Sequence, residues 1–140
     1  MKAKYLFLDF DGVLHSSLCA DNDRFSKVNL LSQAFISSPC QIIISSSWRF
    51  QFTLDQMKKM LPVNISNLII DVTGDAITAE YARYFEIKQW LTNKQKPFAD
   101  WMAIDDSVNE FPPDCPNLIA TKSSQGITKD QIIELKQWLD

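Results

Sequence analysis

Short apolar runs alternate along the chain with segments in which apolar residues recur at helical spacing. Each apolar run is bounded by polar or turn-forming residues, which is the pattern of a strand buried on both faces. Five such strands are predicted, over about 5–8, 42–44, 68–70, 101–104 and 118–120.

The helical spacing predicts four helices, over about 25–37, from Thr53 to Pro62, around 84–91, and from Thr128 onwards. In the first, Val28, Leu31 and Phe35 share one face. The second and the last begin with capping boxes, in which a threonine is followed three residues later by a glutamine. We expect Pro62 to end the second helix, because a proline disfavours helical backbone at the residue before it.

This order of strands and helices predicts the fold class. Near-continuous apolar strands that alternate with helices form parallel sheets covered on both faces. We therefore expect a doubly wound, three-layer α/β/α sandwich with a central parallel sheet of about five strands. No repeat, linker or low-complexity tract interrupts the pattern, which predicts one domain over residues 1–140.

Polar residues follow three of the predicted strands directly. They are Asp9 and Asp11, Ser45 and Ser46, and Asp105 and Asp106. In a doubly wound sheet, ligands bind outside the carboxyl ends of the strands. The sequence therefore predicts that these six residues meet at one edge of the sheet.

Composition narrows the chemistry. The chain has 140 residues, a formal charge of −3, three cysteines and His15 as its single histidine. The net negative charge disfavours sequence-independent binding to nucleic acid, although it is compatible with a local basic pocket for a single phosphate. The unpaired spacing of the cysteines indicates a reducing compartment and argues against a zinc site or a Cys–His or Ser–His nucleophile.

The residues from Met1 to Lys4 lead directly into the first predicted strand, and no long apolar span follows. We therefore expect no secretion signal, no membrane association and a cytoplasmic location.

The strand-end acids fit phosphoryl transfer. This reaction needs a nucleophile in line with the leaving group, a cation and donors to the phosphate oxygens. Mg²⁺ prefers carboxylate oxygens, which Asp9, Asp105 and Asp106 supply. Asp9 and Asp11 are two residues apart in an extended segment and can face the same substrate, and Gly12 permits a sharp turn after them. One acid can attack phosphorus while the other exchanges a proton with the leaving oxygen and with water.

The run 6–14, LFLDFDGVL, resembles the first motif of the haloacid dehalogenase (HAD) phosphohydrolase superfamily. Residues 42–45 resemble its second motif and residues 104–106 its fourth. The resemblance implies that Asp9 is the nucleophile and Asp11 the general acid/base, and that Ser45, with help from Ser46, binds the phosphoryl group. It also implies an Mg²⁺ site made by Asp9, the backbone carbonyl of Asp11 and a fourth-motif acid. We favour Asp106 as that direct ligand, with Asp105 beside it.

The third motif of that superfamily supplies a basic residue that reaches the phosphate. Arg83 lies at the start of the helix before the fourth predicted strand, and Lys88 lies further along it. We favour Arg83. The segments after the first and second motifs are needed for the core, so the chain resembles the capless members. These tend to act on large or exposed phosphomonoesters, so the partner is a phosphorylated small molecule or an exposed macromolecular phosphate.

Other interpretations remain open at this stage. A catalytically silent HAD-like phosphate-binding or regulatory module would bind Mg²⁺ without hydrolysis. A receiver domain would carry its phosphorylated aspartate after the third strand, where Asp71 lies, but the late acid pair fits it poorly. For Trp48, we favour packing within the protein over stacking on the substrate. For His15, we favour a structural role over a contact with the substrate. For Arg49, contact with the leaving group and pairing with a surface acid are equally compatible with the sequence.

Overall fold

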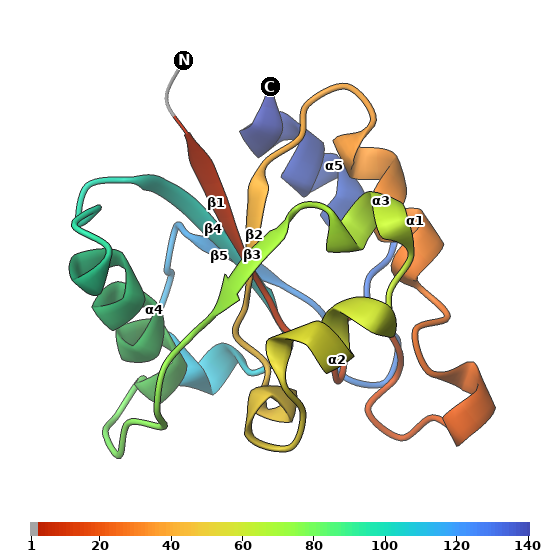
Figure 1. Cartoon of the computed structure of the whole chain (residues 1–140), viewed down its shortest axis with the longest axis horizontal. Coiled ribbons are helices and arrows are strands. Elements are labelled where there is room, and N and C mark those ends of the chain that lie inside the picture. The colour runs from red at the N-terminus through yellow and green to blue at the C-terminus, as the bar shows by residue number, and fades with distance from the viewer. Residues whose placement is uncertain (1–2) are drawn as a thin grey trace.

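A computed structural model describes residues 3–140 and places five strands in one parallel sheet, in the order β3-β2-β1-β4-β5 (Figure 1). The strands are β1 (Lys4–Leu8), β2 (Gln41–Ile44), β3 (Ile69–Val72), β4 (Asp100–Asp105) and β5 (Leu118–Ala120). Each pairs in parallel with its neighbours, and β1 is the central strand. The predicted number, type and rough positions of the strands are confirmed.

Helices cover both faces of this sheet (Figure 1). They are α1 (Val28–Ser32), α2 (Leu54–Lys59), α3 (Val63–Ser66), α4 (Ala82–Asn93) and α5 (Lys129–Leu139). Helix α4 lies on one face alone, and the other four helices lie on the opposite face. The predicted three-layer α/β/α sandwich is confirmed, and residues 3–140 contain no inserted cap.

The alternation of side chains along β1 explains the two layers of core. Leu6 and Leu8 point into the larger apolar cluster beneath α1, α2, α3 and α5, whereas Tyr5 and Phe7 pack against α4. Successive residues of a strand face opposite sides of the sheet, so a fully apolar strand requires both layers. All the β1 residues from Tyr5 to Leu8 are buried, which anchors the residue that follows, Asp9.

The helix predicted over about 25–37 is shorter than its apolar spacing suggests. Phe25 has a left-handed backbone with φ of 62°, which is incompatible with the interior of an α-helix. The α-helix therefore begins at Val28, and after Ser32 the chain tightens into the 3₁₀ turn Gln33–Phe35. The backbone N–H of Phe25 donates to His15 Nδ1 (3.1 Å), a contact that the apolar periodicity does not report.

The helix predicted from Thr53 to Pro62 is α2, which ends before the proline, and a second short helix follows Pro62. The capping box at Thr53 and Gln56 is present, but α2 ends at Lys59, and Pro62 is the N-cap of the short helix α3. Proline is well suited to a helix start because its missing N–H would have no intrahelical partner there. The last helix begins at the predicted capping box of Thr128 and Gln131.

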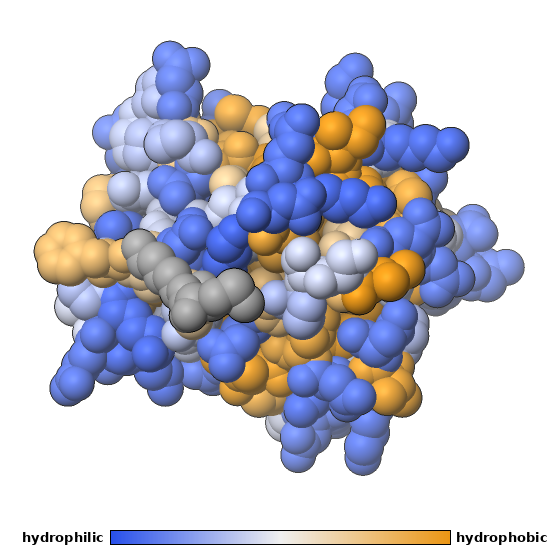
Figure 2. Space-filling model, turned by 90° about the horizontal axis from the view of Figure 1, so that it is seen from above, coloured by the Kyte–Doolittle hydropathy of each residue, from blue (hydrophilic) through white to orange (hydrophobic). Residues whose placement is uncertain are grey.

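The carboxyl ends of the strands and the two termini lie at opposite ends of the molecule (Figure 1). Figure 2 shows the molecule from above, where hydrophobic patches lie between hydrophilic residues. None of the helices within residues 3–140 combines the length and the apolar composition that a membrane crossing needs. The expected absence of a secretion signal is inferred in part from Met1 and Lys2. These two residues lie outside the described residues.

Candidate active site

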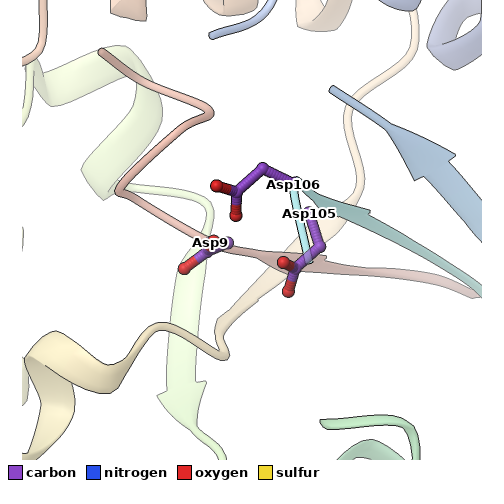
Figure 3. A group of neighbouring side chains, drawn as sticks. All are labelled: Asp9, Asp105 and Asp106. Carbon is purple, nitrogen blue, oxygen red and sulfur yellow. The ribbon is translucent and has the colours of Figure 1, made fainter. Parts of the chain in front are cut away.

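Asp9, Asp105 and Asp106 meet at the carboxyl ends of the neighbouring strands β1 and β4 (Figure 3). Leu8 and Ile104 are paired in the sheet, and the Asp9 N–H donates to the carbonyl of Ile104 (3.2 Å). One carboxylate oxygen from each aspartate lies within 4.8 Å of those of the other two. Asp9 and Asp105 are buried, while Asp106 is half-buried.

The electrostatics of this cluster favour a bound cation. Burial, and then the neighbouring Asp105, raise the pKa of Asp9 well above its ordinary value, against the opposing effect of Arg83. Burial likewise raises the pKa of Asp105. Mg²⁺ prefers hard oxygen donors such as these three carboxylates, and it would stabilise the charged forms of Asp9 and Asp105, which burial disfavours. Asp9 and Asp106, with Asp105 beside them, are the residues that would hold it.

Arg83, in the first turn of α4, lies against the same acids. Its Nη1 donates to Asp105 Oδ2 (2.7 Å) and lies 3.6 Å from Asp9 Oδ1. Its backbone N–H donates to Glu110 Oε2 (3.2 Å), which fixes the start of the helix. Lys88 forms no ion pair or side-chain hydrogen bond within residues 3–140. Of the two candidates for the basic residue, Arg83 is therefore the one in contact with the cluster.

Among residues 3–140, two buried hydroxyls at this edge of the sheet have no partner. Ser45 follows β2 and is fixed by its N–H, which donates to the carbonyl of Leu8 (3.0 Å), but its Oγ has no hydrogen-bond partner within the described residues. The same is true of Thr73 Oγ1, after β3. Buried hydroxyls are normally hydrogen-bonded, because an unpaired one costs about 1–3 kcal/mol. The Ser45 hydroxyl is thus available to an anion bound beside Asp9.

Ser46 has a different local task. Its Oγ accepts a hydrogen bond from the backbone N–H of Trp48 (3.2 Å) and caps the 3₁₀ turn η3 (Ser47–Phe50). This turn carries Arg49, whose guanidinium donates to the carbonyls of Ser45, Ser46 and Gly74. Arg49 also pairs with Glu86 of α4 at 2.8 Å, and both side chains are buried. Arg49 therefore pairs with an interior acid, which neither of its two sequence interpretations included.

The Asp11 carboxylate is not part of the cluster of Asp9, Asp105 and Asp106, and it is half exposed. One of its oxygens accepts a hydrogen bond from His15 Nε2 (2.7 Å) and the other from Trp48 Nε1 (2.9 Å). Since His15 Nδ1 accepts from the Phe25 N–H, the ring hydrogen is on Nε2 and the imidazole donates to Asp11 in its neutral form. His15 and Trp48 together fix the direction of the Asp11 carboxylate.

The turn that directly follows Asp11 requires glycine. Gly12 has φ of 75°, and a Cβ there would lie 2.1 Å from Asp106 Oδ2. Its carbonyl accepts a hydrogen bond from the buried Thr121 hydroxyl (2.6 Å), after β5. Asp106 Oδ2 also accepts from Ser123 Oγ (2.7 Å). The loop after β5 thus supports both the turn and the acid.

Asp71 does not belong to this edge. It lies inside β3, and its carboxylate accepts from Trp90 Nε1 (2.8 Å) and pairs with Lys94 (3.4 Å). A receiver domain would need this carboxylate at the strand end, so the placement of Asp71 argues against that interpretation.

Sequence reasoning missed several supporting residues: Thr73, Glu86, Thr121 and Ser123. None belongs to a recognisable motif, although Glu86 could have been suspected as an acid among the apolar positions of a predicted helix face. The roles of His15 and Trp48 toward Asp11 were also missed, because they depend on side-chain directions that spacing does not determine.

A comparison with protein families gives one match. Residues 5–132 match the family described as the HAD domain in Swiss Army Knife RNA repair proteins. No curated protein and no solved structure matches the chain. The matched region contains β2 to β5, all of β1 except Lys4, and every acid described above, so the chain belongs to this family of HAD domains.

Proposed function

We propose that this HAD-type hydrolase is an Mg²⁺-dependent phosphomonoesterase in which Asp9 is the nucleophile. The observation that carries the proposal is the cluster of Asp9, Asp105 and Asp106 with the Arg83 guanidinium against it. When bound, Mg²⁺ would neutralise phosphate charge and favour the ionised form of the acids. The chain supplies every other group that the reaction needs.

In the proposed reaction, an Asp9 carboxylate oxygen attacks phosphorus, and the bond between phosphorus and the ester oxygen breaks. Arg83 and the unpaired Ser45 hydroxyl donate to the oxygens of the transferring group, where charge is stabilised in the transition state. The result is a phosphoryl group on Asp9 and a free alcohol. Water then attacks phosphorus, which releases inorganic phosphate and restores the carboxylate.

Asp11 would move the protons. Its carboxylic acid form gives a proton to the leaving oxygen, and the resulting carboxylate takes a proton from the attacking water. Its position outside the metal cluster suits both steps, because it is accessible to solvent while His15 and Trp48 hold its direction.

For the substrate, we propose a phosphate at an exposed end of RNA. Two observations support this: the family is described from RNA repair proteins, and residues 3–140 contain no cap to enclose a small metabolite. The overall acidic charge is compatible with it if recognition is confined to the end of the strand and needs only local cations such as Arg83 and Arg24.

The test is phosphate release from oligoribonucleotides carrying a 3′- or a 5′-phosphate, and from a generic aryl phosphate, with and without Mg²⁺. We expect turnover that requires Mg²⁺ and disappears in Asp9→Asn. Activity that survives in Asp9→Asn would rule out the nucleophile. Mg²⁺ binding without turnover on any substrate would instead favour a catalytically silent phosphate-binding module.

A further inference from the structure

A cavity of about 300 Å³ opens directly beside Asp11. It lies between the segment that follows β1 and the segment that contains η3, so its walls come from Asp11 and from the residues that follow the first and second motifs. Its lining includes Asp11, Ser16, Arg24, Trp48, Gln51 and Phe52. Ligand pockets of this volume are small and suit one compact organic group.

The aromatic part of this lining is held in place. The Trp48 ring packs against Phe52 at a centroid distance of 5.5 Å and against Phe10 and Phe25 from other directions. The Arg24 guanidinium lies 5.4 Å from the Trp48 ring and is about half exposed. A fixed aromatic wall next to an adjustable guanidinium favours flat, π-rich ligands.

The position of the cavity indicates which part of a substrate would enter it. In an in-line displacement, the leaving oxygen lies opposite the nucleophile and beside the group that protonates it. Asp11 is that group in the proposed function, and it lines the cavity. Trp48 connects the two directly, because its Nε1 donates to Asp11 while its ring forms part of the wall.

We propose that this cavity binds the terminal nucleoside of the substrate, with its base against Trp48, Phe52 and Arg24 and its phosphate-bearing sugar oxygen at Asp11. Aromatic and guanidinium surfaces bind bases of any sequence by stacking. Ser16 and Gln51 add hydroxyl and amide groups that can hydrogen-bond to sugar or base edges. The inference rests on the proposed function, since it assigns the leaving group of that reaction.

The first experiment changes the substrate. Oligoribonucleotides phosphorylated at the 3′ or the 5′ end are compared with matched strands whose terminal nucleotide is abasic. We expect kcat/KM to be at least about tenfold higher for the strand with the terminal base, since stacking contributes that order of affinity. Turnover that depends on Asp9 but is equal on both strands would overturn the inference and leave the proposed function intact.

The second experiment changes the wall. The preference is the ratio of kcat/KM for the strand with the terminal base to kcat/KM for the abasic strand. In Arg24→Ala and in Phe52→Leu, this ratio is expected to fall toward one. Lys136→Ala is the matched control, because it removes a positive charge from an exposed position near the far end of α5 and should preserve the preference. A preference that persists in both cavity variants would contradict the assignment of the base to this wall.

The third experiment separates binding from turnover. Adenosine monophosphates and ribose 5-phosphate are titrated into Asp9→Asn, and the indole N–H resonance of Trp48 is followed by NMR. A change in its chemical shift with the adenosine compounds but not with ribose 5-phosphate would support a base-binding cavity. This result would hold even if no RNA end were hydrolysed, and only the proposed substrate would then be rejected. No movement with either would overturn the inference.

Discussion

At the scale of single residues, Asp11 is defined by its two hydrogen-bond donors. His15 and Trp48 each donate to one of its oxygens, so the carboxylate has one preferred direction. This matters because proton transfer to a leaving group depends on geometry before it depends on acidity.

Trp48→Phe should reduce activity in proportion to how much the leaving group needs a proton. The substitution keeps an aromatic ring in the packing but removes the donor to Asp11. We expect kcat to fall about tenfold or more on an alkyl phosphate and much less on 4-nitrophenyl phosphate, whose leaving group departs without protonation.

The matched control is Trp138→Phe, since Trp138 Nε1 also donates to a carboxylate, that of Asp100, away from the site. It should change neither rate. Equal losses on both substrates in Trp48→Phe would indicate a packing defect instead of a role toward Asp11.

Asp9→Asn should stabilise the metal-free protein at neutral pH. The folded state raises the pKa of Asp9, so the folded protein holds this proton more tightly than the unfolded chain does. Wild type therefore loses stability as pH rises from the unfolded pKa to the folded pKa, and the penalty persists above it.

The gain in Asp9→Asn should accordingly be absent below about pH 4, the ordinary pKa of an aspartate, and should grow as the pH rises toward neutrality. Urea unfolding with a chelator, at a series of pH values, measures it. Glu134→Gln, at an exposed position of α5, should show no such trend. A loss of stability at pH 7 would contradict the raised pKa.

These residues also show how far sequence reasoning reaches. Asp9, Asp105 and Asp106 could be predicted to meet because each ends a buried parallel strand, and the positions of strand ends follow from the apolar runs. The unpaired hydroxyl of Ser45 could be predicted in position but not in its lack of a partner. Contacts such as that between His15 and Asp11 depend on the local backbone at Phe25, whose positive φ has no sequence signature.

At the scale of elements, the buried pair of Arg49 and Glu86 joins the turn after β2 to helix α4. Arg49 also donates to three carbonyls in two loops, and Glu86 Oε2 accepts from the Ile77 N–H (3.1 Å). The pair therefore positions the helix that carries Arg83 against the loop that carries Ser45.

Glu86→Gln should destabilise the protein by about 3 kcal/mol or more, because it leaves the Arg49 charge buried without its counter-ion. Replacing both residues with methionine should recover part of the loss. Denaturant unfolding of the two single variants and the double variant gives the coupling energy. For the partly exposed pair of Lys94 and Asp71, Lys94→Met should cost less than about 1 kcal/mol. Similar costs at the two sites would refute a special role for the interior pair.

Elements were predicted with uneven success, for physical reasons. Strands and the capped starts of α2 and α5 were found because burial and capping leave local patterns. Helix ends were not, because they depend on local backbone conformations such as the left-handed Phe25. Helix α2 ends at Lys59, before Pro62, and Pro62 caps the start of α3.

At the scale of the whole molecule, metal binding should appear as global stability. A ligand that binds only the folded state stabilises it by about 2.7 kcal/mol at a concentration one hundred times its Kd. We therefore expect Mg²⁺ to raise the melting temperature of wild type in a concentration-dependent way.

Asp106→Asn should weaken this response strongly, whereas Asp114→Asn, at an exposed position with a backbone that asparagine tolerates, should preserve it. Calorimetric scans at increasing Mg²⁺ concentration provide the measurement. An undiminished shift in Asp106→Asn would remove this residue from the metal site.

The central position of β1 in the sheet has a consequence for how the protein folds during its synthesis. β1 is synthesised before the other four strands of this sheet, yet Leu8 must pair with Ile104 on one side and with Ile44 on the other. Contacts between such distant segments form slowly, because the chain loses the entropy of closing a long loop before the contacts stabilise it. On the ribosome, the apolar residues of β1 must therefore wait for most of the chain to emerge. During that wait they form a natural binding segment for chaperones, and the nascent chain cannot have an assembled active site until β4 arrives.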